Sequence, residues 1–94
     1  MIISFQDRAL EACWRDALCD PIHHGIRTHV VRKLDLLAFT ENIDELGRIP
    51  GCRLAALHGS KNLYTLEVDV DWTLVFRYDG GGFRDVWIKQ IKPK

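Results

Sequence analysis

Residues 64–78 read YTLEVDVDWTLVFRY, a stretch that alternates between apolar and polar side chains. Every even position is apolar, and every odd position except Val75 is polar. A repeat of two is typical of β-strand with one face buried. Fully extended, these 15 residues would span roughly 50 Å, which is too long for a domain of this size. We therefore expect a hairpin that reverses at residues 69–71, with Trp72 beginning the return strand.

The chain after the hairpin predicts one more strand. The sequence DGGG at residues 79–82 tolerates positive φ and indicates a turn. Residues 83–91 then form the closing strand. With the chain from Arg53 onward, this predicts a run of three or four antiparallel strands.

The chain before the hairpin predicts mainly helices. Ser4 with Asp7 three residues later is a capping signal between a short strand and a helix. Asp20-Pro21 has the form of an N-cap followed by the first position of a second helix. The expected segments are a strand at residues 2–5, helices at about 6–18 and 21–40, and one or two helical turns at 40–47.

These segments predict an α+β fold for residues 1–94 as a single domain. A short N-terminal strand and two helices pack on one face of a mainly antiparallel sheet, which gives two layers. The apolar even positions of the hairpin face the helices. The odd positions line the other face of the sheet, where a ligand can lie.

Bulk composition excludes a long-range attraction to polyanions. Thirteen basic and thirteen acidic side chains cancel, so nucleic-acid binding would depend on local clusters. Cys13, Cys19 and Cys52 form no C-x-x-C pair, and we expect free, buried thiols in a reducing cytosol. No signal peptide and no membrane-spanning stretch is found in the sequence, so a soluble, cytoplasmic protein is expected.

Several motifs together resemble a known family. They are the Ser-Phe of the first strand, the loop PGCRL at residues 50–54, Leu57-x-Gly59, the strand motif Trp72-x-Leu74-x-Phe76-Arg77, and Asp85-Val86. In this order the chain resembles the HigB-like plasmid maintenance killer toxins of the RelE/ParE superfamily. The resemblance covers nearly the whole chain.

The resemblance implies a toxin of a type II toxin–antitoxin system. Such a toxin cleaves messenger RNA on the ribosome, and a cognate helix-turn-helix antitoxin silences it. The attack comes from the 2′-hydroxyl of the RNA itself. This reaction needs a proton acceptor, a proton donor and cations around the phosphorane, and we expect no metal, no cofactor and no membrane partner.

The resemblance also implies site residues. His58, Lys61, Arg77 and Lys92 are the candidate catalytic residues, with His58 transferring a proton because its ordinary pKa suits proton transfer near neutral pH. Phosphate binding is assigned to Arg53, Lys61, Arg77, Lys92 and Lys89. The helix-face residues Arg27, Arg32 and Lys33 could contact ribosomal RNA in a ribosome-bound toxin, but solvent exposure on a helix face is the favoured interpretation. In the plainer alternative, Arg77 pairs with Glu67 across the hairpin.

Departures from the family pattern favour an alternative function. Ala55 replaces a common His, Thr73 replaces the Arg of a Trp-Arg pair, and the family ending Asp-Tyr-His is absent. The alternative is a toxin-fold binding module, either a ParE-like inhibitor of DNA gyrase or a catalytically degenerate relative that holds its antitoxin. The carboxylates of the hairpin (Glu67, Asp69 and Asp71) would oppose RNA on the open face.

Other conspicuous residues are interpreted structurally. We expect Trp14, Trp72 and Trp87 to lie in the core or to contact an antitoxin, not to stack on bases. The histidines at positions 23, 24 and 29 have poor spacing for a metal site and are expected to have a structural or surface role.

Overall fold

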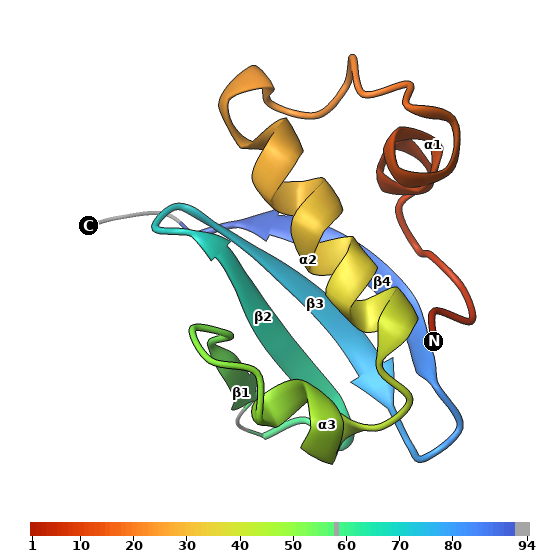
Figure 1. The fold of residues 1–94 in the computed structure, drawn as a ribbon, viewed down its shortest axis with the longest axis vertical. Helices are drawn as coiled ribbons and strands as arrows, with labels where there is room; N and C mark the ends of the chain where they lie inside the picture. The colour runs from red at the N-terminus through yellow and green to blue at the C-terminus, as the bar shows by residue number, and fades with distance from the viewer. Residues whose placement is uncertain (58, 92–94) are drawn as a thin grey trace.

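The computed structural model describes residues 1–57 and 59–91, and it has two layers (Figure 1). One layer is an antiparallel sheet of four strands in the order β1-β2-β3-β4. The other is helical, and α2 crosses in front of the sheet in the view of Figure 1. The expected α+β architecture, with helices on one face of an antiparallel sheet, is confirmed.

The predicted hairpin forms the middle of the sheet. The sheet consists of β1 (Leu54–Ala56), β2 (Leu63–Asp69), β3 (Trp72–Tyr78) and β4 (Phe83–Gln90). The reversal between β2 and β3 lies where it was expected. Its turn is stabilised by Asp69, whose Oδ1 accepts hydrogen bonds from the amides of Asp71 at 2.8 Å and Trp72 at 3.1 Å. A side chain that bonds its own backbone two residues on replaces the Asn-Gly or Asp-Gly of the commonest tight turns.

The turn before β4 needs its glycines because the N-terminal segment lies against it. Gly82 has φ +111°, and a Cβ on it would lie 2.6 Å from Cγ1 of Ile3. The first residues bridge β4 in parallel, Ile2 with Phe83 and Phe5 with Val86. The expected N-terminal strand is thus present as two isolated bridges.

Helix α1 (Arg8–Asp16) begins later than expected and has a different cap. Asp7 is the N-cap, and its Oδ1 accepts from the amides of Ala9 and Leu10. The prediction of Ser4 as the cap was wrong because the Ser4 hydroxyl bonds to Asp85 instead. The helix ends at Asp16, and its C-cap residue, Ala17, has φ 59°.

A disulfide follows this helix end and corrects the expectation of three free thiols. Cys13 and Cys19 are bonded, with their Cα atoms 4.2 Å apart. The left-handed turn at Ala17 brings the chain back toward the last turn of α1, which is how two cysteines six positions apart meet. Cys52 is free.

The second helix begins six residues later than predicted. Cys19 O accepts from the amide of Ile22, so Asp20-Pro21 lies in a turn and caps no helix. A short 3-10 turn, η1 (His24–Ile26), leads into α2 (Arg27–Phe39). Ile22 and Ile26 are both buried, and their burial holds this segment in its non-helical path.

A short third helix follows α2. Helix α3 (Ile43–Gly47) has Asn42 as its N-cap, and Asn42 Oδ1 accepts from the amide of Glu45. The expected capped turn at residues 40–47 is confirmed.

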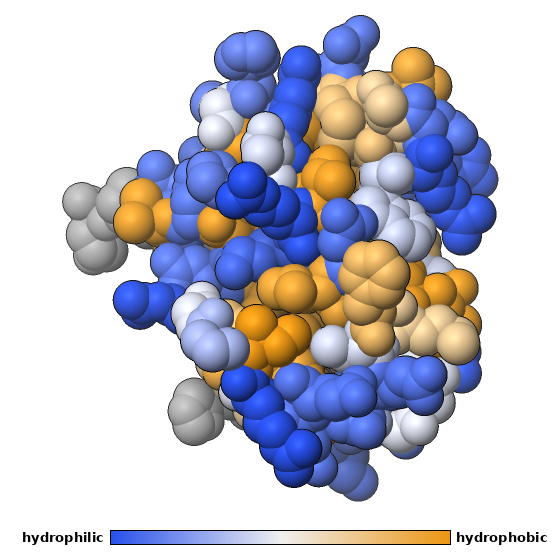
Figure 2. All heavy atoms as spheres, viewed as in Figure 1, coloured by the Kyte–Doolittle hydropathy of each residue, from blue (hydrophilic) through white to orange (hydrophobic). Residues whose placement is uncertain are grey.

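The core lies between the helices and the even positions of the hairpin. Its fully buried large side chains include Leu10, Leu34, Leu37, Leu46, Leu66, Leu74, Phe76 and Phe83. Trp14 and Trp72 pack against this cluster, as expected. Seen from the helix side, apolar side chains gather near the middle of the surface and also appear at the upper right, and polar residues cover most of the bottom (Figure 2). Across residues 1–57 and 59–91, no helix has the length and apolar character to cross a membrane.

The cap of α1 provides a test of this part of the fold. Replacing Asp7 with Ala should lower the free energy of unfolding by about 0.5–2 kcal/mol, because two helix amides lose their acceptor. Asp16→Ala, at the other end of the same helix, is the matched control and should not destabilise, since a carboxylate there opposes the helix dipole. Urea denaturation of both variants measures the difference. Equal destabilisation would contradict the assignment of the cap.

Candidate open-face site

The candidate site is the face of the sheet opposite the helices, which we call the open face. Cross-strand pairing places its side chains in rows. The middle row is Ala55, Thr65, Val75 and Trp87, which are successive partners across the four strands. Glu67, Thr73 and Lys89 form a second row. Arg77 belongs to a third row, about 13 Å from Thr73 along β3 at the usual rise per residue.

The middle of the open face is a hollow with an apolar floor. This sheet hollow has a volume of about 620 Å³ and is lined by Leu57, Thr65, Thr73, Val75, Trp87, Lys89, Gln90 and Ile91. Val75 is only 2% exposed. The polar odd positions predicted a face open to solvent, but its centre is buried. The Thr73 hydroxyl donates to Leu66 O at 3.1 Å, which leaves it bonded within the sheet. The floor therefore offers mainly apolar contact, and none of its described lining residues is a carboxylate.

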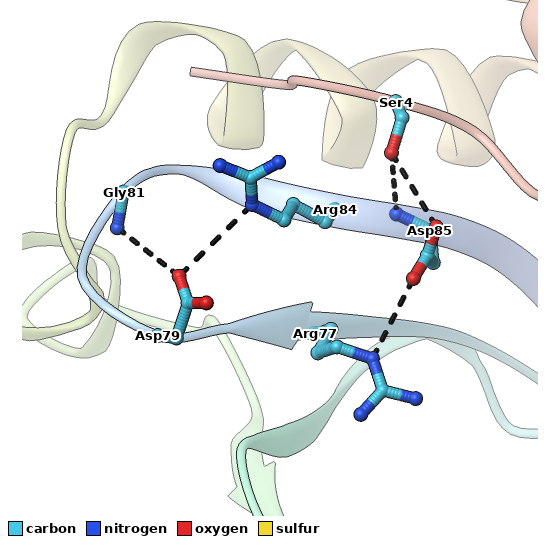
Figure 3. A network of polar contacts seen from close by, with 6 residues as sticks. All are labelled: Ser4, Arg77, Asp79, Gly81, Arg84 and Asp85. Atoms are coloured by element: carbon cyan, nitrogen blue, oxygen red, sulfur yellow. Dashed lines mark hydrogen bonds and ion pairs between the residues drawn. The ribbon is translucent and has the colours of Figure 1, made fainter.

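Arg77 lies at one end of the open face and is held by Asp85 (Figure 3). Its Nε lies 3.5 Å from Asp85 Oδ2. The Asp85 amide donates to Ser4 Oγ at 3.0 Å, and the Ser4 hydroxyl donates to Asp85 Oδ1 at 3.5 Å. The alternative pairing of Arg77 with Glu67 was wrong, because Glu67 pairs with Arg53.

Asp85 reaches Arg77 because β4 is irregular at this point. The register between β3 and β4 shifts between Val75 and Arg77, and Asp85 has φ 52°. Asp tolerates this left-handed conformation better than most residues. The same close-up shows a second pair in the adjoining turn, where Arg84 Nε lies 4.0 Å from Asp79 Oδ1 (Figure 3). Gly81 donates its amide to the same oxygen at 3.4 Å.

The other end of the open face carries a second arginine and a lysine. Arg53 Nε lies 3.3 Å from Glu67 Oε1, and the side chain of Arg53 is 78% exposed. Lys89 is exposed at the edge of the sheet hollow and has no ion pair among the described residues. Two of the three hairpin carboxylates are engaged: Glu67 pairs with Arg53, and Asp69 accepts hydrogen bonds from amides of the turn.

The structure brings some of the predicted site residues together and separates others. Lys61 is exposed in the loop between β1 and β2, at the Arg77 end of the sheet, because Leu63 is the register partner of Arg77. His58 and Lys92 lie outside the described residues. Arg27 donates to Ile22 O and Asp20 O, a structural role at the start of α2. The helix residues Arg32 and Lys33 lie in the helical layer, away from the open face.

No described thiol or carboxylate cluster indicates a nucleophile or a metal centre. Burial raises the pKa of the Cys52 thiol, the effect of nearby Lys33 being smaller, so the thiol stays protonated near neutral pH. Nowhere in residues 1–57 and 59–91 are three His, Cys, Asp or Glu side chains grouped as a metal ion would need. The metal-free hypothesis stays a prediction.

Trp87 and Asp85 are the residues that sequence reasoning did not assign to the site. Trp87 lines the sheet hollow and does not belong to the core cluster, so the expectation of a core position for Trp87 was wrong. Alternation along β4, with Val86 buried and Trp87 on the other face, could have identified it. The partner of Arg77 could not be found this way, because the bulge at Asp85 breaks the alternation.

The geometry of the open face suits an extended, charged chain with flat rings. An apolar floor with a tryptophan lies between two ends that each carry an arginine and a lysine. Both arginines are paired through Nε, and the two terminal nitrogens of Arg77 point away from Asp85 (Figure 3). These nitrogens remain available to a phosphate.

Comparison with known proteins identifies the class and then the family. A family model described as the RelE-like toxin of the type II toxin-antitoxin system HigB matches residues 3–90. This match covers nearly the whole chain and defines the class, a toxin with a RelE-like fold. Within that class, the chain belongs to the HigB-like family of type II toxins.

A similar protein from another organism adds less information. An uncharacterized protein of Haemophilus influenzae is 28% identical over 60 residues, which is 63% of this chain and 59% of the relative. The matched part of the chain thus spans about three fifths of that relative's length.

The two arginine pairs should contribute little to stability. Arg53→Gln and Arg77→Gln should each change the free energy of unfolding by less than about 1 kcal/mol, because both pairs are solvent-exposed. Leu66→Ala, in the core beside the same strands, should cost about 2–5 kcal/mol and shows that the assay resolves a structural role. Chemical denaturation gives all three values. A loss comparable to that of Leu66→Ala would make the arginines structural.

Proposed function

We propose that the protein inhibits translation by cleaving messenger RNA on the ribosome, without a metal or cofactor. Membership of the HigB-like toxin family supports a toxin, and the open face supports RNA as its substrate. The single observation that carries the proposal is the sheet hollow, an apolar floor with Trp87 that has cations at both ends. A single-stranded RNA needs both features, since its bases stack on aromatic rings and its phosphates bind cations.

In this proposal the RNA lies across the open face, and the residues divide the work. Arg77 and Lys61 bind phosphate at one end, and Arg53 and Lys89 bind phosphate at the other. Trp87 supports a base between them. The 2′-hydroxyl attacks the adjacent phosphorus, the bond from phosphorus to the 5′-oxygen breaks, and a 2′,3′-cyclic phosphate forms. His58 accepts the proton of the attacking hydroxyl, Lys92 contributes positive charge near the leaving 5′-oxygen, and this oxygen takes a proton from solvent water.

The nuclease assignment is tested by growth arrest and by toeprinting on translating ribosomes. Replacing His58 with Ala together with Arg77→Gln should abolish growth arrest and remove codon-aligned cuts, because both the proton acceptor and a phosphate ligand are lost. Arg15→Gln is the matched control: this residue also forms a carboxylate pair through Nε, at 3.2 Å from Glu11, but on α1. It should cut like the parent chain. If growth arrest survives the double substitution, the assigned roles are wrong.

The role of Trp87 is tested separately from phosphate binding. Trp87→Ala should lower the cleavage rate about tenfold or more, because stacking on an aromatic side chain contributes about 1–3 kcal/mol per base. Trp87→Phe keeps an aromatic ring and should retain most of the activity. Single-turnover cleavage of ribosome-bound messenger RNA measures both. Equal loss in the two variants would indicate disturbed packing, which a thermal melt would also reveal.

The second candidate is a binding module without nuclease activity, in the form of a gyrase inhibitor or a degenerate relative that holds its antitoxin. It is favoured by the pairing of both open-face arginines with carboxylates, Arg53 with Glu67 and Arg77 with Asp85. An apolar hollow between two paired arginines also suits a protein segment. Under this alternative, toeprinting shows no cuts from the parent chain. A gyrase supercoiling assay then separates a gyrase inhibitor from a module that only holds its antitoxin.

A further inference from the structure

The outer side of α2 carries a second surface that is distinct from the open face. His29, Arg32, Lys33, Leu36 and Phe39 are spaced by three or four residues, so they form one stripe along the helix. With Asp35 and Val68 they line a groove of about 540 Å³, which we call the α2 groove. Val68 lies in the even register of β2, so the α2 groove is on the helical side of the sheet.

Two large apolar side chains are exposed along the α2 groove and at the strand turn next to it. Phe39 is 82% exposed, although the helix around it packs on the sheet. Val70, two residues beyond Val68 in the turn, is 80% exposed. Figure 2, drawn from this side, shows apolar side chains near the middle of the face with polar ones above and below them. An apolar centre with a polar rim is the composition of a protein interface.

The rim of the α2 groove is positively charged. Within residues 1–57 and 59–91, neither Arg32 nor Lys33 forms an ion pair. The carboxylate on this rim, Asp35, is engaged, because its Oδ1 accepts from the Trp14 indole at 3.0 Å. Two free cations beside an apolar stripe complement a segment that carries carboxylates next to apolar side chains.

We infer that the α2 groove binds an acidic amphipathic segment of a partner protein. Phe39 and Leu36 contact the apolar side of that segment, and Arg32 and Lys33 pair with its carboxylates. A protein segment fits better than RNA, because Asp35 on the rim repels phosphate and Leu36 and Val68 offer it nothing to bond. The partner this family membership implies is the antitoxin, so the inference names where the antitoxin docks and rests on the toxin part of the proposed function.

The test uses the whole chain and the protein encoded beside its gene, purified and titrated by calorimetry. Phe39→Ser should weaken binding about tenfold or more, because exposed aromatic anchors carry much of an interface's affinity. Arg32→Glu combined with Lys33→Glu should weaken it at least as much and reduce its dependence on salt. Leu18→Ser and Arg8→Glu, both exposed outside the α2 groove, are the matched controls and should stay within about twofold.

Three results would overturn the inference. The first is an affinity that none of the groove variants changes. The second is intact antitoxin binding with lost co-sedimentation on ribosomes in the charge-exchange variant, which assigns the cations to ribosomal RNA. The third is self-association of the parent chain that Phe39→Ser abolishes while antitoxin binding persists, which assigns the groove to a second copy.

These outcomes are independent of the nuclease proposal. Phe39 is exposed and lies outside the open face, so Phe39→Ser should fold normally and still arrest growth when the antitoxin is absent. If the parent chain cuts no messenger RNA but the groove variants lose the antitoxin, the nuclease proposal fails and the α2 groove stands. If the parent chain cuts messenger RNA and the groove variants bind the antitoxin normally, the α2 groove inference fails and the nuclease proposal stands.

Discussion

Strand β3 is buried on both of its faces, and the rest of the structure depends on this constraint. Leu74 and Phe76 are fully buried against the helical layer, while Thr73 and Val75 are 7% and 2% exposed on the open face. A register slip of one residue would exchange these two sets. Burial would leave the Thr73 hydroxyl without a hydrogen-bond partner, but it donates to Leu66 O across the hairpin. With β3 fixed, its neighbours β2 and β4 inherit a fixed register and so do the rows of the open face.

An irregularity in the pairing of β3 with β4 then orients specific side chains. Bulges bend a strand and redirect a residue out of the alternating pattern. The shift between Val75 and Arg77 lets Phe83 and Val86, three positions apart, both face the core, and it turns Asp85 toward Arg77. Ser4, brought in by the parallel bridges of the N-terminal segment, fixes the Asp85 backbone. The position of one cation on the open face is therefore set by residues from both ends of the chain.

The sequence predicted what depends on periodicity and turn residues, and it could not predict what depends on contacts between distant segments. The alternation at residues 64–78 and the DGGG turn were sufficient for the hairpin and for β4. Val70 fits the alternating pattern, which predicts a buried side chain, but it is exposed because it lies in the turn. The pattern alone does not show where a strand ends. Asp7 and Ser4 are both residue types that favour the N-cap position. The choice between them depends on the hydrogen bond between Ser4 and Asp85, which lies 81 positions away in the sequence. The Cys13–Cys19 bond likewise follows from one left-handed residue, Ala17. For the site, the sequence indicated the basic residues. Their carboxylate partners and the position of Trp87 could be identified only from the register of strand pairing in the structure.

The neutral charge of the chain and the pairing of its open-face arginines are compatible with binding a polyanion. Equal numbers of basic and acidic side chains give no long-range steering, so attraction must act at short range. Exposed ion pairs contribute only about 0–1 kcal/mol, because water and salt screen them. A phosphate can therefore take over Arg53 or Arg77 at small cost, using terminal guanidinium nitrogens as a charge-assisted donor pair. Without a ligand, Glu67 and Asp85 hold Arg53 and Arg77 at the two ends of the open face, which reduces the conformational entropy that binding would have to remove. Glu67, which was expected to oppose RNA on the open face, is instead paired with Arg53 and would keep this arginine positioned for a bound phosphate.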